Sequence, residues 1–419
     1  MKTKLLLLCF VLVASTFYVK SATSDWDGIT RTVWAGGEGT AADPVLIESA
    51  ANLAYMASDE ARTGFGTYLN KYFKLTTDID LKNHAWTPIY VFIGNFDGNG
   101  HKIMGLNVTA ADDNGTGLFK QVNGTGTVKN LGIESGSVSG GTTYEFVGSI
   151  AGSVNEGGTI DKCYNKATIS GKSYVGGIVG QLSGGTVSNC YNRGAITGTT
   201  ASVGGVVGRY FWQLCNLSNS YNAGVIVGNP AIGYVGSVVG TFADALKPAS
   251  VVSNNYYDFD VNYDSSLLGI GVEGNPTGVD VFNSPGSTED GVPPKTVSVT
   301  QRSTSQMKST DMITDLGSAY ESDSKNINGG YPVLTWENLP PTGLVYNKFV
   351  DFQITKVNNG ISISADDFEH ITLSVYSITG VEIITKSLKN AEYIRLTSGI
   401  YIIKLTRGSQ KFVQKIQVF

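Results

Sequence analysis

The block Val-Gly-Gly-Ile-Val-Gly at residues 175–180 decides the fold, because it recurs along the chain at nearly constant spacing. The other copies are Val-Gly-Ser-Ile-Ala-Gly at 147–152, Val-Gly-Gly-Val-Val-Gly at 203–208 and Val-Gly-Ser-Val-Val-Gly at 235–240. The copies therefore start 28, 28 and 32 residues apart. A regular period of this size is typical of repeat architectures, in which each unit stacks on its neighbours.

A second block follows each copy after a variable polar segment. These blocks are Ile-Asp-Lys-Cys-Tyr-Asn at 160–165, Val-Ser-Asn-Cys-Tyr-Asn at 187–192, Leu-Ser-Asn-Ser-Tyr-Asn at 217–222 and Val-Ser-Asn-Asn-Tyr-Tyr at 252–257. Every run is only a few residues long, and none shows a helical period. Such short strands bury little surface alone, whereas stacked coils bury their Val, Ile and Leu together and pair their backbones between coils. The repeat therefore predicts an all-β fold, a right-handed parallel β-helix, which is a type of solenoid.

The composition agrees with this interpretation and excludes other classes. The 419 residues include 52 glycines, and charged residues make up only 16%. A disordered chain would have more charge and fewer aromatics, and collagen would need glycine at every third position. We expect the recurring glycines to mark the corners of the coils, often with positive φ. The net charge of −5 argues against nucleic acid or an anionic membrane as the main partner.

The N-terminal residues read as a secretory signal peptide over 1–21. A basic start, a short apolar run and small residues precede an expected cleavage site after Ser21. The predicted β-helix then occupies residues 22–338. A helix over 49–62, with Ser49 as its N-cap, is expected to close the N-terminal end of the apolar interior.

The C-terminal residues have a different pattern. A linker over 339–349 contains two prolines, and the glycine repeat stops there. From 350 to 419 apolar residues mostly alternate in period two, with turns between the runs. This pattern predicts a small antiparallel β-sandwich of six or seven strands.

Two parts of the chain resemble known bacterial families. Residues 175–198 resemble the GLUG-motif repeat of bacterial surface proteins, and residues 327–336 look like the closing coil of that family. Leu-Ser-Val-Tyr-Ser-Ile-Thr-Gly at 373–380, with Leu-Thr-Ser-Gly-Ile-Tyr at 396–401, resembles the type A sorting domain of type IX secretion. The first resemblance implies a β-helix, adhesive in some members and attached to enzymes in others. The second implies a secreted or cell-surface protein whose partners include outer-membrane export and anchoring machinery.

One variable segment is a candidate for ligand binding. Tyr210, Phe211 and Trp212 follow one another, and successive side chains of a strand cannot all point inward. Exposed aromatic rings stack on sugars or anchor protein partners. The alternative is that the three rings cover the flank of the β-helix.

The residues Asp258, Asp260 and Asp264 are a candidate calcium site. Carboxylates at alternate positions begin many calcium loops. The sixth position is Tyr263 and the twelfth is Gly269, so the segment does not fit an EF-hand. The alternative is a solvated loop, and no other cofactor is predicted.

Two columns of equivalent residues are interpreted as architecture. Cys163 and Cys190 recur at one position, where either a disulfide or a column of small buried residues fits. The second column consists of Asn130, Asn189, Asn219 and Asn254. Stacked Asn side chains can bond the turns of their own and neighbouring coils.

These observations favour a secreted or cell-surface, non-catalytic binding protein of the adhesin type. Its β-helix would present loops to an extracellular glycan or to a host or matrix protein. The first alternative is a β-helix carbohydrate-active enzyme, a polysaccharide lyase or glycoside hydrolase, but no column of carboxylates supports it. The second alternative is a purely structural surface spacer.

Overall fold

The computed structural model describes most of the chain after residue 24. The described residues are 25–34, 36–58, 68–109, 115–141, 145–200, 202–211, 214–228, 234–243, 250–262, 268–270, 297–338, 352–357, 360–365, 371–377, 381–407 and 410–418. The signal peptide expected over 1–21 lies outside them. None of the helices in these ranges is long and apolar enough to cross a bilayer.

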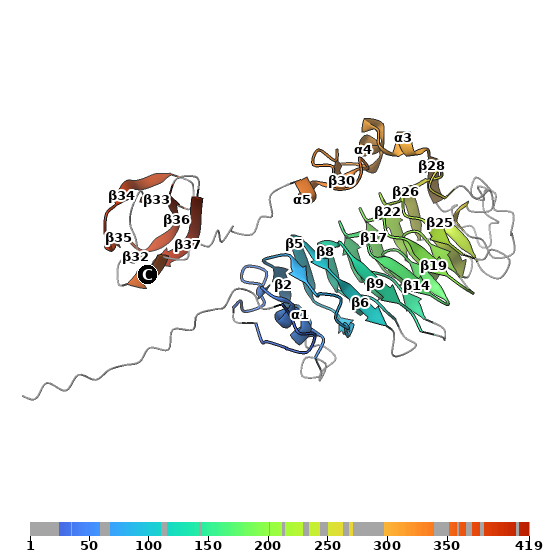
Figure 1. The fold of residues 1–419 in the computed structure, drawn as a ribbon, viewed down its shortest axis with the longest axis horizontal. Helices are drawn as coiled ribbons and strands as arrows, with labels where there is room; N and C mark the ends of the chain where they lie inside the picture. The colour runs from blue at the N-terminus through green and yellow to red at the C-terminus, as the bar shows by residue number, and fades with distance from the viewer. Residues whose placement is uncertain are drawn as a thin grey trace, which may run out of the picture.

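The body of the chain is a parallel β-solenoid of about six turns, as the repeat predicts. Figure 1 shows the coils stacked side by side, coloured from blue at the N-terminal end to yellow. Each coil adds short strands to three parallel sheets, here called sheets A, B and C.

The strands of each sheet are as follows. Sheet A contains β1 (Val45–Ile47), β2 (Tyr72–Leu75), β3 (Ile79–Asp80), β5 (Asn95–Met104), β8 (Thr127–Ile133), β12 (Thr159–Asp161), β13 (Tyr164–Asn165), β17 (Thr186–Ser188), β18 (Tyr191–Asn192), β22 (Asn216–Ser218), β23 (Tyr221–Asn222), β26 (Val251–Asp258) and β28 (Val297–Arg302). Sheet B contains β6 (Leu106–Thr109), β9 (Gly136–Ser139), β14 (Thr168–Gly171), β19 (Ile196–Gly198) and β24 (Ile226–Val227). Sheet C contains β4 (Ile89–Phe92), β7 (Phe119–Asn123), β10 (Phe146–Val147), β11 (Ala151–Asn155), β15 (Tyr174–Gly176), β16 (Val179–Ser183), β20 (Val203–Gly204), β21 (Val207–Phe211), β25 (Val235–Ala243) and β27 (Leu268–Ile270).

The register between coils confirms the alignment of the repeats. The first valines of the four copies lie in one row, because β10, β15, β20 and β25 pair in parallel. The first residues of the second blocks lie in another row through β12, β17, β22 and β26. Both rows point inward and are buried in one continuous core. Stacking therefore supplies the apolar burial that a single coil lacks.

The recurring glycines are required for a different reason from the one expected. Gly176, Gly180, Gly204 and Gly208 do not have positive φ. A Cβ on Gly204 would lie 2.0 Å from the carbonyl oxygen of Val207, and one on Gly180 would lie 2.3 Å from the backbone nitrogen of Val147. Close approach of backbone within and between coils, rather than a left-handed corner, excludes a side chain at these positions.

Left-handed backbone occurs along the predicted Asn column and at turn glycines such as Gly157 and Gly184. Asn130, Asn189, Asn219 and Asn254 have φ of 52°, 52°, 50° and 53°. Asn is tolerated there because its short polar side chain bonds locally. The amide of Asn219 donates to Asn189 Oδ1 at 3.4 Å, so the column also links adjacent coils.

A second Asn ladder, fully buried, lies inside the solenoid. The Nδ2 of Asn165 donates to Asn192 Oδ1, and the Nδ2 of Asn192 donates to Asn222 Oδ1, both at 2.8 Å. Each Asn also bonds the backbone of its own coil two residues further on. The cysteines Cys163, Cys190 and Cys215 are buried and free, so the column of small buried residues, not a disulfide, is the correct alternative.

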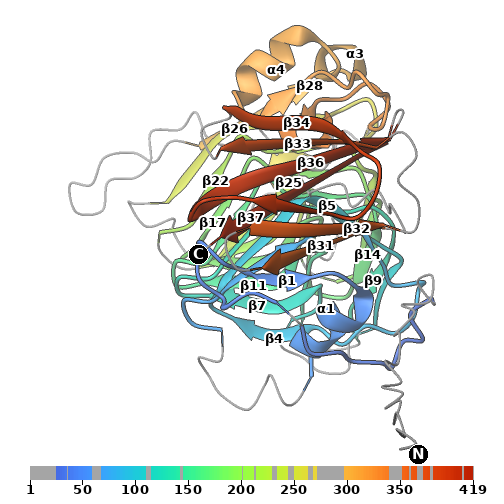
Figure 2. The ribbon, with the colours of Figure 1, turned by 90° about the vertical axis from the view of Figure 1, so that its left-hand side faces the viewer.

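A short helix covers the N-terminal end of the core. Helix α1 (Ala50–Met56) begins after Ser49, whose side chain accepts the N–H of Asn52 as the predicted N-cap. Leu53 and Met56 are buried in the solenoid core. Figure 2 shows α1 and β1 at the end of the coil stack that faces the viewer. The helix is shorter than predicted, since α1 ends at Met56, and residues 59–67 lie outside the described ranges.

Residues 303–338, here called the strap, run back along the outside of the solenoid. The strap contains α3 (Thr304–Met307), α4 (Thr310–Leu316), the hairpin of β29 (Tyr320–Glu321) and β30 (Val333–Leu334), and α5 (Thr335–Asn338). Figure 1 shows these elements, in orange, leading from β26 and β28 back toward β5. The expected closing coil over 327–336 is therefore wrong: this segment covers the outer face of coils already formed.

The C-terminal residues form the predicted antiparallel β-sandwich, with seven strands in the described ranges. One sheet contains β31 (Phe352–Val357), β32 (Gly360–Ala365) and β35 (Glu392–Arg395). The other contains β34 (Glu382–Leu388), β33 (Ile371–Ser377), β36 (Gly399–Arg407) and β37 (Gln410–Val418). The alternating apolar residues of these strands make a separate core.

Candidate functional site

The structure separates the three aromatic residues of the predicted ligand segment. Tyr210 points into the solenoid and is 1% exposed, so it is a core residue and not a ligand contact. Phe211 points outward from sheet C and is half-buried. Trp212 lies outside the described residues. Val207 and Tyr210 are both in the core although they lie three residues apart, so strict alternation is interrupted at Gly208. Arg209 and Phe211 consequently face outward.

Arg209 shares the outward face with Phe211 and forms an aromatic–arginine ladder. Its guanidinium lies 4.5 Å from the ring centroid of Tyr174 and 4.3 Å from that of Phe211. The other neighbour of Tyr174 is Phe146, whose ring is stacked with it at 5.5 Å. We call these four residues, Phe146, Tyr174, Arg209 and Phe211, the ladder.

The ladder follows from the coil register. Phe146 pairs with Tyr174 across β10 and β15, so their rings stack at the spacing of the coils. All four ladder residues are half-buried, and their exposed edges give sheet C an apolar strip with one cation. Phe146, Tyr174 and Arg209 were not among the predicted ligand contacts, because that prediction rested only on the three consecutive aromatic residues 210–212. Phe146 and Tyr174 each directly precede a copy of the recurring Val-Gly, and this shared position could have indicated that their rings stack.

The predicted calcium carboxylates are used for structural hydrogen bonds. Asp258 is fully buried, and its Oδ1 accepts the N–H groups of Asp260 and Val261. Its Oδ2 accepts the hydroxyl groups of Thr304 and Tyr331 at 2.7 and 2.6 Å.

The carboxylate of Asp260 also bonds the strap. Asp260 accepts the N–H of Thr304 at the start of α3, and Asp264 lies outside the described residues. Those ranges contain no group of three His, Cys, Asp or Glu that could hold a metal. Asp258 and Asp260 therefore hold the strap to the last coil, a structural role in place of the one predicted for these two residues.

Beneath the strap lies a column of stacked tyrosines. Tyr164, Tyr191 and Tyr221 occupy one row of sheet A, with ring centroids 5.1 Å apart in each pair and nearly parallel planes. Trp336 of α5 extends the stack beyond Tyr164 at 5.6 Å. The tyrosines point out of the solenoid, and the apolar side chains of the strap bury them in a second cluster. The fifth letter of the second block therefore forms the docking surface for the strap.

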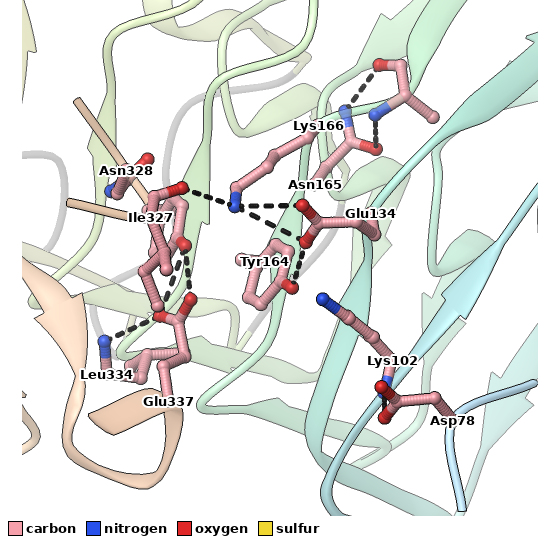
Figure 3. Close-up of polar contacts among 12 residues, drawn as sticks. Asp78, Lys102, Glu134, Tyr164, Asn165, Lys166, Ile327, Asn328, Leu334 and Glu337 are labelled. Atoms are coloured by element: carbon pink, nitrogen blue, oxygen red, sulfur yellow. Dashed lines mark hydrogen bonds and ion pairs between the residues drawn. The ribbon is translucent and has the colours of Figure 1, made fainter. Parts of the chain in front are cut away.

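Two carboxylates join the strap to this column (Figure 3). Glu134, which follows β8, accepts the hydroxyl of Tyr164 and pairs with Lys166 at 3.3 Å. Lys166 Nζ also donates to the carbonyl of Ile327 on the strap at 3.0 Å. Glu337 of α5 accepts the hydroxyl of Tyr191 at 2.9 Å. Glu134 and Glu337 both bond groups of the chain itself. Their contacts therefore connect the strap to the solenoid, and the two carboxylates do not form an acid–base pair that faces a substrate.

Glu337 gives the docking of the strap a pH dependence. Burial raises the pKa of its carboxyl from 4.5 to about 7. Because the pKa is raised, the docked strap favours the protonated carboxyl of Glu337. The contribution of this carboxyl to the free energy of docking is therefore complete below pH 4.5 and is lost as the pH rises through about 7. Because Glu337 as a whole is only half-buried, we take its pH-dependent contribution to the free energy of strap docking as about 2 kcal/mol.

The variant Glu337→Gln is expected to remove this dependence, because Gln cannot ionise. Limited proteolysis of the strap at pH values from 4.5 to 8 would show wild-type strap opening increasing with pH, with a flatter profile for the variant. The pKa values of Asp78 and Asp80 are lowered in the folded chain, so these groups titrate below this window in both proteins. Parallel profiles for the two proteins would contradict the assignment.

Comparisons with known proteins address the repeat and the tail. Residues 171–197 match the model of the GLUG motif. Residues 357–418 match the model of the secretion system C-terminal sorting domain. The chain carries a GLUG motif and a sorting domain. The sorting domain is the type found in type IX secretion, which indicates a secreted or cell-surface-attached protein.

Relatives share only part of the chain. Halomucin of Haloquadratum walsbyi is 31% identical over 170 residues, which cover 37% of this chain and 2% of halomucin. A candidate Gly-rich membrane protein of Evansella cellulosilytica is 32% identical over 164 residues, which cover 37% of this chain and 17% of that protein. The chain thus spans less than a fifth of each. Among solved structures, a candidate immunoglobulin A1 protease from Bacteroides ovatus matches with a TM-score of 0.46 and 22% identity, over 72% of this chain and 94% of that one.

Proposed function

We propose that this protein is a non-catalytic binding protein of the adhesin type, displayed at the cell surface. In this proposal residues 1–21 are removed after Ser21, the solenoid with its strap over 22–338 binds the ligand, and 339–349 link it to the sorting domain over 350–419. The ligand is an extracellular glycan or a host or matrix protein.

The ladder on sheet C carries this proposal. Aromatic edges beside a guanidinium are enriched where proteins bind other molecules, because they combine apolar area with directed hydrogen bonds. The tyrosine column is the larger aromatic surface, but the strap already covers it. The ladder, by contrast, is a group of adjacent aromatic residues that is still partly exposed on sheet C. In contrast, the carboxylates of the strap junction are engaged within the chain, which favours binding over hydrolysis.

Removal of ladder side chains is expected to abolish ligand binding. The full-length chain would be applied to an array of glycans and matrix proteins, beside a variant with Tyr174→Ala, Arg209→Ala and Phe211→Ala. We expect binding by the wild type and at least a tenfold loss in the variant. The matched control is Tyr393→Ala, which removes an exposed tyrosine from the sorting domain.

Two other results would contradict the proposal. Release of reducing sugars from an array glycan would show that the protein is an enzyme. Equal binding by the wild type and the triple variant would place the ligand elsewhere on the surface. Circular dichroism of both proteins would establish that the triple variant retains its solenoid.

A further inference from the structure

A row of polar side chains crosses sheet C beside the ladder. Gln181, Arg209 and Thr241 pair in register through β16, β21 and β25, so they lie on three consecutive coils. Arg209 projects outward, and its direct neighbours in a parallel sheet project to the same side. Neighbouring strands are about 4.8 Å apart, which brings the three polar groups within reach of one small ligand.

Each of these side chains has a buried polar atom without a hydrogen-bond partner. The atoms are Gln181 Oε1, Arg209 Nε and Thr241 Oγ1. Gln181 is 8% exposed and Thr241 is 4% exposed. Buried polar atoms in folded proteins are nearly always hydrogen-bonded, so three unpaired atoms in one row indicate a missing partner.

The preceding coils show that hydrogen-bond partners are missing only in this part of the row. In the same row, Gln121 accepts the amide of Asn123, and Ser153 accepts the amide of Asn155 at 3.0 Å. The row is therefore satisfied within the chain until it reaches Gln181. From Gln181 to Thr241 the described part of the chain provides no such partner for these three atoms.

The charge of Arg209 defines that molecule. In the part of the chain that the structure describes, no carboxylate pairs with its guanidinium and no acceptor bonds its N–H groups. The rings of Tyr174 and Phe211 hold the guanidinium in place without neutralising it. A carboxylate is the natural partner, because the guanidinium and the Thr241 hydroxyl can both donate to it.

We infer that the row of Gln181, Arg209 and Thr241 binds the carboxylate of an acidic sugar within an extracellular glycan. The inference rests on the proposed binding function and names the ligand class. Gln181 Oε1 accepts a neighbouring sugar hydroxyl, and the edges of the ladder rings contact the apolar C–H groups of the sugar. The net charge of −5 disfavours dense polyanions, so the ligand has isolated acidic units.

Titration of the full-length chain with matched oligosaccharides tests this inference. The probes are an oligosaccharide with one uronic acid, one with one sialic acid, the same two reduced at the carboxyl to the alcohol, and heparin. We expect at least one acidic probe to bind, and its reduced form to bind at least tenfold more weakly. Arg209→Gln is expected to cause a similar loss, and Arg209→Lys a smaller one.

The chain provides a matched control for the arginine. Arg193 is also stacked on an aromatic ring, at 4.0 Å from Tyr331, but it donates to the carbonyl of Ala223 and lies beneath the strap. Arg193→Gln is expected to leave binding unchanged. If Arg209→Gln fails to fold, Thr241→Val tests the same site and is expected to weaken binding about threefold.

The remaining outcomes separate the inference from the proposed function. Equal binding of acidic and reduced probes, or preferred binding of heparin, would overturn the acidic-sugar site while leaving a binding protein. Binding of a protein ligand alone would do the same. Absence of binding to every glycan and matrix protein would overturn both.

Discussion

Replacing Asn192 with alanine is expected to lower the free energy of unfolding of the solenoid by about 4 kcal/mol. Asn192 is fully buried in the middle of the inner Asn ladder. Its Nδ2 donates to Asn222 and to the carbonyl of Gly194, and its Oδ1 accepts from Asn165 and from the N–H of Gly194. Alanine would remove one buried hydrogen bond from each of these four groups, three of which keep a second partner. The loss is about 1 kcal/mol for each bond, with incomplete additivity.

Tryptophan fluorescence in urea measures this change selectively. All five tryptophans precede residue 339, so their signal follows the solenoid and strap and not the C-terminal sandwich. The control is Asn189→Gly in the outer column, where glycine accepts the φ of 52°. We expect the control to cost about 1 kcal/mol, because Asn189 is only half-buried. Equal losses in the two variants would show that the inner ladder has no special role.

The two Asn columns show what the repeat could and could not predict. Register was predictable because the inward valines recur in every unit, and the structure pairs the same residues. The different roles of the two columns were not predictable, because Asn189 and Asn192 recur equally well in the sequence. Which one turns the corner depends on backbone geometry between short strands, where no period-two pattern is long enough to assign a side.

The glycines were located correctly, but positive φ explains only some of them. Their positions in register were evident, but a glycine can serve either positive φ or close backbone approach. Only the coil-to-coil spacing decides between these reasons, as the 2.0 Å contact at Gly204 shows. The same limit applied to Tyr210: the argument that successive residues face opposite sides was correct, but the chain alone did not say which side was inside.

The strap was not predictable as a cover, although the tyrosines that require one were visible. A tyrosine that recurs on the outward side of stacked coils leaves a continuous apolar strip, which a soluble protein covers or uses for binding. Residues 327–336 were assigned to a closing coil because of their resemblance to the end of the repeat family. The contacts of Trp336 with Tyr164 and with the carbonyl of Lys162 instead anchor them on the outer face.

Asp258→Ala is expected to release the strap from the last coil, with a loss of about 3–4 kcal/mol. The carboxylate of Asp258 is the one group that bonds the strap through both Thr304 and Tyr331 while also ordering the turn after β26. Its removal would leave two hydroxyls and two N–H groups without their acceptor. Proteolytic cleavage within the strap should accelerate, and the fluorescence of Trp336 should change as its stack with Tyr164 opens.

Asp258→Asn separates this role from calcium binding. The amide oxygen can still accept the N–H groups of Asp260 and Val261, and the amide nitrogen can donate to the oxygens of Thr304 and Tyr331. We therefore expect Asn to cost only about 1 kcal/mol. A calcium site would behave differently: both variants would lose a calcium-dependent gain in stability that the wild type shows. Because every oxygen of Asp258 is already occupied by the chain, we expect calcium to change the unfolding of none of the three proteins, and the ranking Ala, Asn, wild type to reflect hydrogen bonding alone.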